Sequence, residues 1–197
     1  LEFGHAGARV VGFPPGGGRF FDWEDHGLVA ALAPRLEAGH FHLFCPDPAD
    51  GDGWLADWKH PGARVWRQHQ YDAYLRDELV PFTARLDPHP FVIAAGPNLG
   101  GFHALSFGLR HPDLVNRVLA MSAVCDVRDL ADGFYNDHLY AVNPPDFVPN
   151  ERDPSRLDLL RRQDVILAVG RADRLVGQNR DLSGKLWAKG IGNALRE

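Results

Sequence analysis

The fold is decided by the stretch Phe91-Val92-Ile93-Ala94-Ala95-Gly96-Pro97-Asn98-Leu99-Gly100-Gly101-Phe102-His103-Ala104-Leu105. Its first five residues are apolar and suit a strand that is buried on both faces, as in a parallel sheet. Gly96, Gly100 and Gly101 allow a sharp turn and close packing of the following helix on the sheet. The stretch therefore predicts a buried strand, a tight turn and a helix, the repeating unit of an α/β fold.

The turn in this stretch has the layout of a nucleophile elbow, Gly-x-Ser-x-Gly, with one change. In α/β-hydrolases the elbow presents a serine hydroxyl above the sheet, at the start of a helix. Here the middle position is Asn98, whose side-chain amide cannot act in acyl transfer as a serine does. The sequence therefore predicts a hydrolase fold in which the attacking atom is replaced.

Strands and helical stretches alternate on both sides of this unit. We predict strands at 8–13, 40–44, 91–95, 117–123 and 165–170, with another opening at 193–195. We predict helices at 24–36, 65–86, 99–111, 154–162 and 182–189, with a possible kink at Pro81. The alternation indicates one α/β-hydrolase domain over 1–197, with a mostly parallel central sheet and helices on both faces.

Two segments have loop composition and are expected to lie near the ligand. Residues 46–62 are rich in Asp, Gly and Trp, and residues 132–150 combine aromatic residues with three prolines. Loops of this length in a compact domain are usually functional or mobile. We predict that 132–150 is irregular and covers a pocket.

Composition and charge exclude several classes of function. The length of 197 residues suits one domain, and 45% hydrophobic residues can fill its core. A net charge of −5 without a dense Lys/Arg cluster argues against nucleic acid and anionic membranes as partners. No apolar run approaches the ~20 residues of a membrane span, and no signal-peptide pattern opens the chain, so we expect a cytoplasmic protein. The first residue is Leu1 rather than Met, which suggests trimming at one or both ends.

Cysteines and clustered acids do not indicate a metal site. Cys45 and Cys125 end apolar segments and are predicted to be reduced, buried thiols. No Cys/His cluster has zinc spacing. Asp47, Asp50 and Asp52 lack the glutamate that an EF-hand needs at its twelfth position, so we expect a solvated turn.

A candidate acid follows a late strand, where a Ser-His-Asp site needs one. Asp173 stands just after the strand 165–170, in Gly-Arg-Ala-Asp. The structural alternative for Asp173 is a turn residue that bonds its own backbone. Asp126 follows the preceding strand and is the second candidate, with a helix N-cap as its alternative.

Oxyanion donors and pocket walls can also be assigned to positions. An oxyanion hole needs one N–H from the residue after the nucleophile and one from the loop after an early strand. Leu99 is the candidate for the first donor, and the loop that contains Gly17, Gly18 and Arg19 is the candidate for the second. We predict a pocket lined by Phe20, Trp54, Tyr135 and Asn98.

The histidine of a triad is harder to place. All ten histidines fall at or before His138, and none follows Asp173. His103 lies on the helix after the elbow and is expected to pack against the sheet or a loop. His138 lies in the aromatic segment and is the one histidine that could reach the pocket mouth, but we favour an exposed loop position for it. Ser106 is two turns beyond the elbow and is expected to be a helix-surface or packing residue.

The order of these motifs resembles a known family, the Putative esterase family of α/β-hydrolases, and within it a small bacterial cytosolic branch. The family includes S-formylglutathione hydrolases and mycolyltransferases. The resemblance rests on Leu1-Glu2-Phe3-Gly4-His5, Gly16-Gly17-Gly18-Arg19-Phe20, Glu24-Asp25-Gly27, Phe44-Cys45, Arg76-Asp77-Glu78-Leu79-Val80-Pro81-Phe82, Gly100-Gly101-Phe102-His103-Ala104-Leu105, Met121-Ser122 and Asp132-Gly133-Phe134-Tyr135.

The resemblance implies a serine-esterase mechanism on an ester or acyl ligand, with neither a metal nor an organic cofactor. It assigns Asn98 to the nucleophile position, Asp173 to the acid position and Leu99 to an oxyanion donor. The family's histidine follows the last strand, and this sequence ends before it.

Three hypotheses follow for the function. The first, which we favour for the chain as given, is a pseudoenzyme whose retained pocket serves in binding or assembly; edge strands and the aromatic segment are compatible with a homodimer. The second is an active serine carboxylesterase, of which this sequence carries a substitution at Asn98 and lacks the C-terminal histidine segment. The third is deamidation of Asn98 to a nucleophilic aspartate, which the branched Leu99 side chain would slow.

Overall fold

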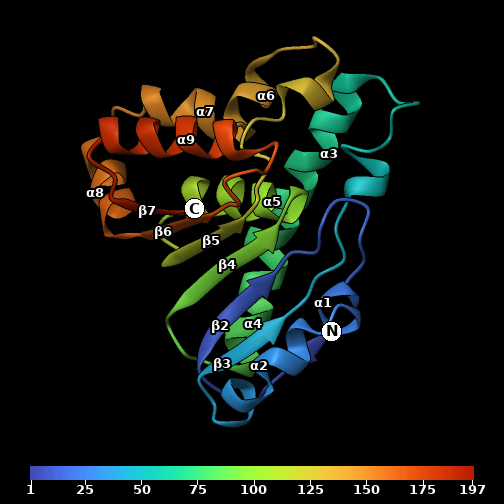
Figure 1. Ribbon diagram of the computed structural model, residues 1–197, viewed down its shortest axis with the longest axis vertical. Helices are drawn as coiled ribbons and strands as arrows, with labels where there is room; N and C mark the ends of the chain where they lie inside the picture. Colours follow the sequence, from blue (N-terminus) through green and yellow to red (C-terminus); the bar gives the residue numbers. More distant parts are fainter.

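A computed structural model describes residues 1–197, and one seven-stranded sheet with the order β1-β3-β2-β4-β5-β6-β7 runs through it. Only the β1–β3 pair is antiparallel; the other pairs are parallel. Figure 1 shows β4 near the middle of this sheet. The predicted mostly parallel α/β architecture is therefore confirmed. The strands are β1 (Glu2–Phe3), β2 (Ala8–Gly12), β3 (Phe41–Phe44), β4 (Val92–Pro97), β5 (Arg117–Met121), β6 (Asp164–Ala168) and β7 (Asn193–Arg196).

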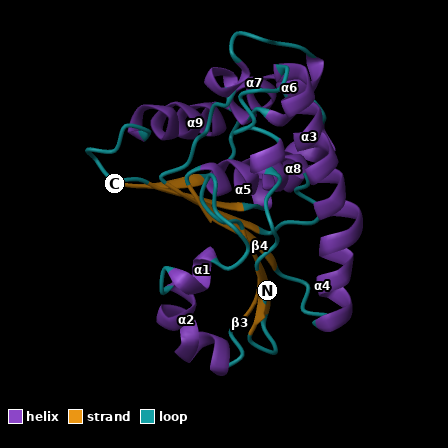
Figure 2. Cartoon of the chain, turned by 90° about the vertical axis from the view of Figure 1, so that its right-hand side faces the viewer, coloured by secondary structure: helices purple, strands orange, loops and turns teal.

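Helices cover both faces of the sheet. Figure 2 shows the sheet nearly edge-on, with α1 and α2 on one side and α3, α4 and α5 on the other. None of the helices combines the length and the apolar character that crossing a bilayer requires. The helices are α1 (Asp22–Asp25), α2 (Leu28–Glu37), α3 (Pro61–Tyr74), α4 (Val80–Leu86), α5 (Leu99–Arg110), α6 (Asp137–Val142), α7 (Pro144–Phe147), α8 (Pro154–Arg162) and α9 (Val176–Ala188).

The β4–α5 unit forms the centre of the molecule. β4 pairs with β2 on one side and β5 on the other, and its residues Val92 to Gly96 are buried. Every residue of α5 from Leu99 to Leu109 is also buried. The hydroxyl of Ser106 donates to the Val142 carbonyl at 2.8 Å, so this serine packs inside the helix layer as expected.

Two glycines let α5 approach the sheet so closely. A Cβ atom on Gly100 would lie 2.2 Å from the Pro14 carbonyl oxygen, and one on Gly101 would lie 2.6 Å from the Ala123 Cβ. Real Cβ atoms do not come this near to other heavy atoms, and neither neighbour is the end of a flexible side chain, so no larger residue fits without moving the chain. The glycine pattern from which the turn was predicted is therefore a steric requirement of this fold.

The predicted helix 65–86 is divided where its proline falls. α3 begins at Pro61, a π-helical turn occupies Leu75–Leu79, and α4 follows with Pro81 in its first turn. Proline has no N–H to donate, and its ring clashes with the carbonyl four residues earlier in a regular α-helix. The wider π turn accommodates both effects and keeps the two helices continuous.

The prediction that 132–150 is irregular was wrong, because two short helices lie there. Asn136 caps α6 by accepting the Leu139 N–H at 2.9 Å. Pro144 stands in the first turn of α7, where a proline needs no hydrogen bond. The prolines in this segment resembled helix breakers in the sequence, whereas in the structure they start a helix.

Two further elements differ from the predictions. α9 begins at Val176, six residues before the predicted start at 182. Its first turns contain Asn179, which is fully buried and donates to the Ala123 carbonyl at 2.9 Å. A polar residue at that position hid the helical pattern. The two-residue strand β1 is too short to show any periodicity.

Both cysteines are free and buried, as predicted. Burial raises the pKa of Cys45 to about 12 and also raises that of Cys125. Because the thiolate is the reactive form, we expect neither thiol to react with iodoacetamide in the folded protein at neutral pH, and both to react in denaturant. Mass spectrometry after a timed pulse measures this; rapid labelling of either thiol under native conditions would contradict the placement.

Candidate functional site

Asn98 occupies a strained turn between β4 and α5. Its φ of 52° and ψ of −118° lie in a region that few non-glycine residues adopt, at a cost of about 1–3 kcal/mol. The backbone holds this conformation from both sides: the N–H donates to Met121 at 2.9 Å, and the carbonyl accepts from Val124 at 3.1 Å. The side chain is half-buried and has no hydrogen-bond partner, so its amide is free to meet a ligand.

The carboxyl ends of three strands meet beside this turn. In the sheet register Pro97 pairs with Met121, and Met121 pairs with Ala168. The N–H of Ser122 continues this register by donating to the Ala168 carbonyl at 2.7 Å. The elbow, the end of β5 and the loop after β6 therefore lie side by side at one edge of the sheet.

Asp173 lies in the loop after β6 and is turned toward this edge. Its carboxylate accepts the Leu175 N–H at 2.8 Å. That hydrogen bond, and after it the nearby Ser122 side chain, lower the pKa of Asp173. The turn contact that the sequence offered as an alternative is thus present, together with a contact to the strand beside the elbow.

Because the pKa of Asp173 is lowered in the folded protein, its contribution to folding stability depends on pH. A carboxyl whose pKa is lower in the folded state stabilises the fold at a pH above its unfolded pKa. That contribution is lost as the pH falls through the folded value.

Ser122 was not singled out by sequence reasoning as a site residue. Its φ of 43° is one of only three positive values outside glycine, and the others belong to Asn98 and Asp132. Two of these three residues therefore stand at neighbouring strand ends. A serine carries no sequence signal for such a conformation, which is imposed by the tertiary structure.

The contact between Ser122 and Asp173 can be tested by titration. We expect Ser122→Ala to raise the pKa of Asp173, but only in part because the Leu175 N–H remains. Carboxyl ¹³C chemical shifts measure this pKa. The pKa of Asp77, which is lowered by its hydrogen bond from Arg76, is the internal control and should not move. An unchanged pKa of Asp173 would show that the serine hydroxyl does not reach it.

The glycine loop after β2 lies against the elbow, but one of its proposed donors is not available. A Cβ atom on Gly16 would lie 3.4 Å from the Asn98 Oδ1. Gly17 has a φ of +79°, and the Gly18 N–H donates to the Pro15 carbonyl at 2.8 Å. Gly18 is therefore corrected from a possible oxyanion donor to the closing residue of a turn. Gly17 and Leu99 remain predicted donors.

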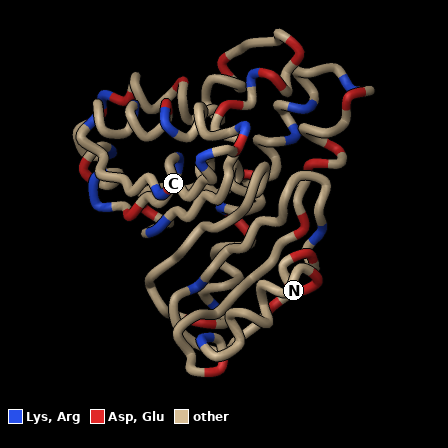
Figure 3. The backbone as a smooth tube through the Cα atoms, viewed as in Figure 1, with Lys and Arg blue, Asp and Glu red and all other residues tan.

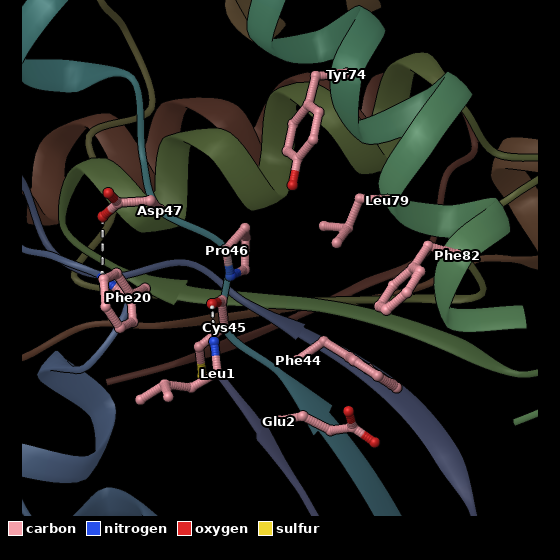
Figure 4. A pocket seen from close by; sticks show the side chains of 10 residues that line it. All are labelled: Leu1, Glu2, Phe20, Phe44, Cys45, Pro46, Asp47, Tyr74, Leu79 and Phe82. Carbon is pink, nitrogen blue, oxygen red and sulfur yellow. Dashed lines mark hydrogen bonds between the residues drawn. The ribbon is translucent and has the colours of Figure 1, made fainter. Parts of the chain in front are cut away.

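Arg19 and Phe20 are anchored to the loop after β3. The Arg19 guanidinium donates to the Asp47 carboxylate at 2.8 Å, and the Phe20 N–H donates to it at 3.2 Å. Phe20 lines a cavity of about 470 Å³ (Figure 4), together with Asp47 and Tyr74. This cavity contains none of the other three residues of the predicted pocket.

Of the two predicted pocket walls Trp54 and Tyr135, the structure corrects Trp54, whereas Tyr135 stays a prediction. Trp54 is buried, with its ring perpendicular to that of Phe102 and its Nε1–H donated to Gln68 at 2.9 Å. Tyr135 is more than half exposed, and its hydroxyl lies near the Asp146 side chain. The orientations of both side chains depend on how the loops pack, which composition does not indicate.

The expectation of a solvated turn at Asp50 was wrong. Asp50 is 1% exposed, and its Oδ1 lies 2.8 Å from the Nε2 of His103, which is fully buried in α5. The pair ties the loop after β3 to the elbow helix. The sequence signal was His103 itself, since a histidine on a buried helix needs a polar partner. Asp52 is exposed, as expected.

The structure also shows where the two histidines with predicted surroundings lie. His103 packs against a loop, as predicted. His138 is exposed on α6, where it lies against the rings of Trp66 and His69.

The described residues contain no group of three or more His, Cys, Asp or Glu side chains that could hold a metal ion.

Comparison with known proteins places this architecture in a family. Residues 47–189 match the sequence model of the family described as Putative esterase. A homoserine O-acetyltransferase of Sulfurimonas autotrophica is 33% identical over 89 residues, which are 44% of this chain and 23% of that protein. The chain thus matches less than a quarter of that relative's length.

Solved structures share the fold at low sequence identity. A ferulic acid esterase has a TM-score of 0.72 at 19% identity, over 97% of this chain and 76% of its own. An S-formylglutathione hydrolase of Agrobacterium tumefaciens has a TM-score of 0.72 at 16% identity, over 98% and 76% of the two chains. MPT51 of Mycobacterium tuberculosis has a TM-score of 0.68 at 14% identity, over 99% and 82%.

Proposed function

Because the chain belongs to the Putative esterase family, we propose that it binds a carboxylic ester or acyl compound at the elbow without hydrolysing it. The observation that carries this proposal is Asn98. It keeps the strained backbone of an elbow and a free, half-buried side chain, but it offers an amide where acyl transfer needs a nucleophile.

The chemistry of the amide explains why the site would bind an ester and why it would not hydrolyse it. The lone pair of an amide nitrogen is delocalised into the carbonyl, so it neither attacks an ester nor forms an acyl intermediate that water could release. The same group donates and accepts hydrogen bonds. A ligand carbonyl at the start of α5 can accept from the Asn98 amide and from the Leu99 N–H, where the helix dipole favours partial negative charge.

A second candidate function is hydrolysis of a carboxylic ester, and it is favoured by what surrounds Asn98. Asn98 has the strained backbone that an elbow requires, and Asp173 lies in the loop at the same edge of the sheet. The names of the structural neighbours, ferulic acid esterase and S-formylglutathione hydrolase, describe such activities in those proteins. In this chain a nucleophile other than Asn98 would then have to act.

Binding at the elbow can be tested by titrating ¹⁵N-labelled protein with ethyl butyrate and, separately, butyrate. We expect saturable shifts at the Leu99 amide, and we expect Asn98→Leu to weaken binding about tenfold by removing the side-chain hydrogen bonds. Asn150→Leu is the matched control, because Asn150 is exposed and bonds only the Asp146 carbonyl. Shifts that stay away from the elbow, or equal affinity in Asn98→Leu, would contradict the proposal.

A further inference from the structure

The cavity of about 470 Å³ drawn in Figure 4 lies between the sheet edge formed by β1 and β3 and the helical segment that runs from α3 into α4. Figure 4 shows Tyr74, Leu79 and Phe82 pointing into it from the helices, with Phe44 and Glu2 on the side of the sheet. The volume falls within the range of small-molecule sites, roughly 300–1,000 Å³. None of the elbow residues lines this cavity, so a ligand here is independent of the one proposed at the elbow.

The π turn between α3 and α4 builds the helical wall of the cavity. Because a π turn spans five residues, it places Leu79 one turn below Tyr74, a spacing that does not share a face in a regular α-helix. Phe82 follows three residues later, on the same side. Tyr74 is 38% exposed and Phe82 is 43% exposed. Exposed apolar side chains gathered around one cavity are characteristic of a binding site.

The sheet side of the cavity presents a carboxylate that is held in place. Glu2 and Phe44 are directly opposite each other on β1 and β3, so their side chains lie on one face of the sheet. His42 shares this face: its ring stacks on Phe44 with 4.3 Å between the centroids, and its Nε2 lies 2.8 Å from the Glu2 Oε1. The other carboxylate oxygen of Glu2 makes no hydrogen bond and is available to a ligand.

The charges along the wall oppose an anionic ligand. Two carboxylates line the cavity, those of Glu2 and Asp47, and no Lys, Arg or His side chain does. Asp47 is bonded to Arg19 at 2.8 Å, and the Leu1 ammonium donates to the Cys45 carbonyl at 3.0 Å. An anion would therefore find no basic side chain at the wall, whereas a cation would meet the free carboxylate oxygen of Glu2.

The aromatic rings of the wall favour a particular kind of cation. Ring faces attract alkylated ammonium ions, which lose little hydration when they leave water. One cation already lies over a ring of this wall, since the Arg85 guanidinium is 5.6 Å from the Phe82 centroid. We propose that this cavity binds a small alkylated ammonium compound, such as choline. Its methyl groups lie against the rings of Tyr74 and Phe44, and its charge faces the Glu2 carboxylate.

The experiment is titration of the ¹⁵N-labelled chain with choline and, separately, with 3,3-dimethyl-1-butanol, which has the shape of choline without its charge. We expect choline to give saturable shifts at the Leu79 and Phe82 amides and to bind about tenfold more tightly than the alcohol. Tyr74→Leu keeps an apolar side chain and removes the ring. Glu2→Gln removes the charge and keeps an oxygen for His42. Each should weaken choline binding about fivefold.

Trp187→Leu and Glu37→Gln are the matched controls, because both residues are exposed and neither lines this cavity. Their affinity for choline should equal that of the unmodified chain. The proposal is overturned if choline does not bind, if it shifts only the elbow amides, or if the neutral alcohol binds as tightly. An unchanged choline affinity in Tyr74→Leu or in Glu2→Gln would also overturn it, and Glu2→Gln decides the matter if Tyr74→Leu does not fold.

Discussion

Gly100→Ala is expected to destabilise the protein by about 3 kcal/mol or more. The added Cβ would lie 2.2 Å from the Pro14 carbonyl oxygen and 2.6 Å from that of Phe13, both backbone atoms at the end of β2. These atoms cannot rotate away as a side chain can. Either α5 moves off the sheet or the glycine loop moves off the elbow, and both lose buried packing.

Urea unfolding followed by tryptophan fluorescence measures this loss. Gly184→Ala is the matched control: Gly184 lies inside α9, is exposed, and has nothing within 4 Å of an added Cβ. We expect that variant to be more stable by about 0.5–1 kcal/mol, the usual advantage of alanine over glycine in a helix. If both variants had the same stability, the close approach at Gly100 would be refuted.

Replacing His103 by alanine is expected to have the second large effect, about 3–5 kcal/mol of lost stability. His103 and Asp50 are both essentially unexposed, and their hydrogen bond of 2.8 Å crosses from α5 to the loop after β3. Without the imidazole, the Asp50 carboxylate is buried with no partner. This unpartnered buried carboxylate, more than the lost hydrogen bond itself, causes the loss of folding stability.

The same reasoning separates this pair from surface ion pairs. Asp181→Ala removes the exposed contact with Lys185 and should change stability by less than about 0.5 kcal/mol. The double variant Asp50→Asn with His103→Gln keeps an amide hydrogen bond without a charge and should recover most of the loss. Equal unfolding midpoints for His103→Ala and Asp181→Ala would contradict the burial of the pair.

The centre of the fold could be predicted because its residues carry strong local constraints. Five apolar residues followed by spaced glycines leave few alternatives to a buried strand and a close-packed helix, and β4 and α5 are found there. Asp173 was placed at the sheet edge by the apolar strand before it, which is β6. In both cases the side chain's position follows from the backbone element that carries it.

Other features depended on contacts between distant segments. Asp50 and His103 are 53 residues apart, and no local pattern links them. Trp54 turns into the core because Phe102 and Gln68 receive it there. The left-handed conformation of Ser122 arises at a strand end, where Asp173 and the elbow meet. Composition indicated that these loops matter, but tertiary packing decides which side chains face inward.

Hydrolysis of p-nitrophenyl butyrate by the unmodified chain, with Asn98→Ser and Asn98→Leu assayed beside it, decides whether the site at Asn98 binds esters without cleaving them. We expect the unmodified chain and Asn98→Leu to release nitrophenolate no faster than buffer, because neither an amide nor a leucine side chain at the elbow can attack the ester. Turnover that appears only in Asn98→Ser would show that the rest of the site is intact. Saturable turnover by the unmodified chain would contradict the account, since another group would then be the nucleophile.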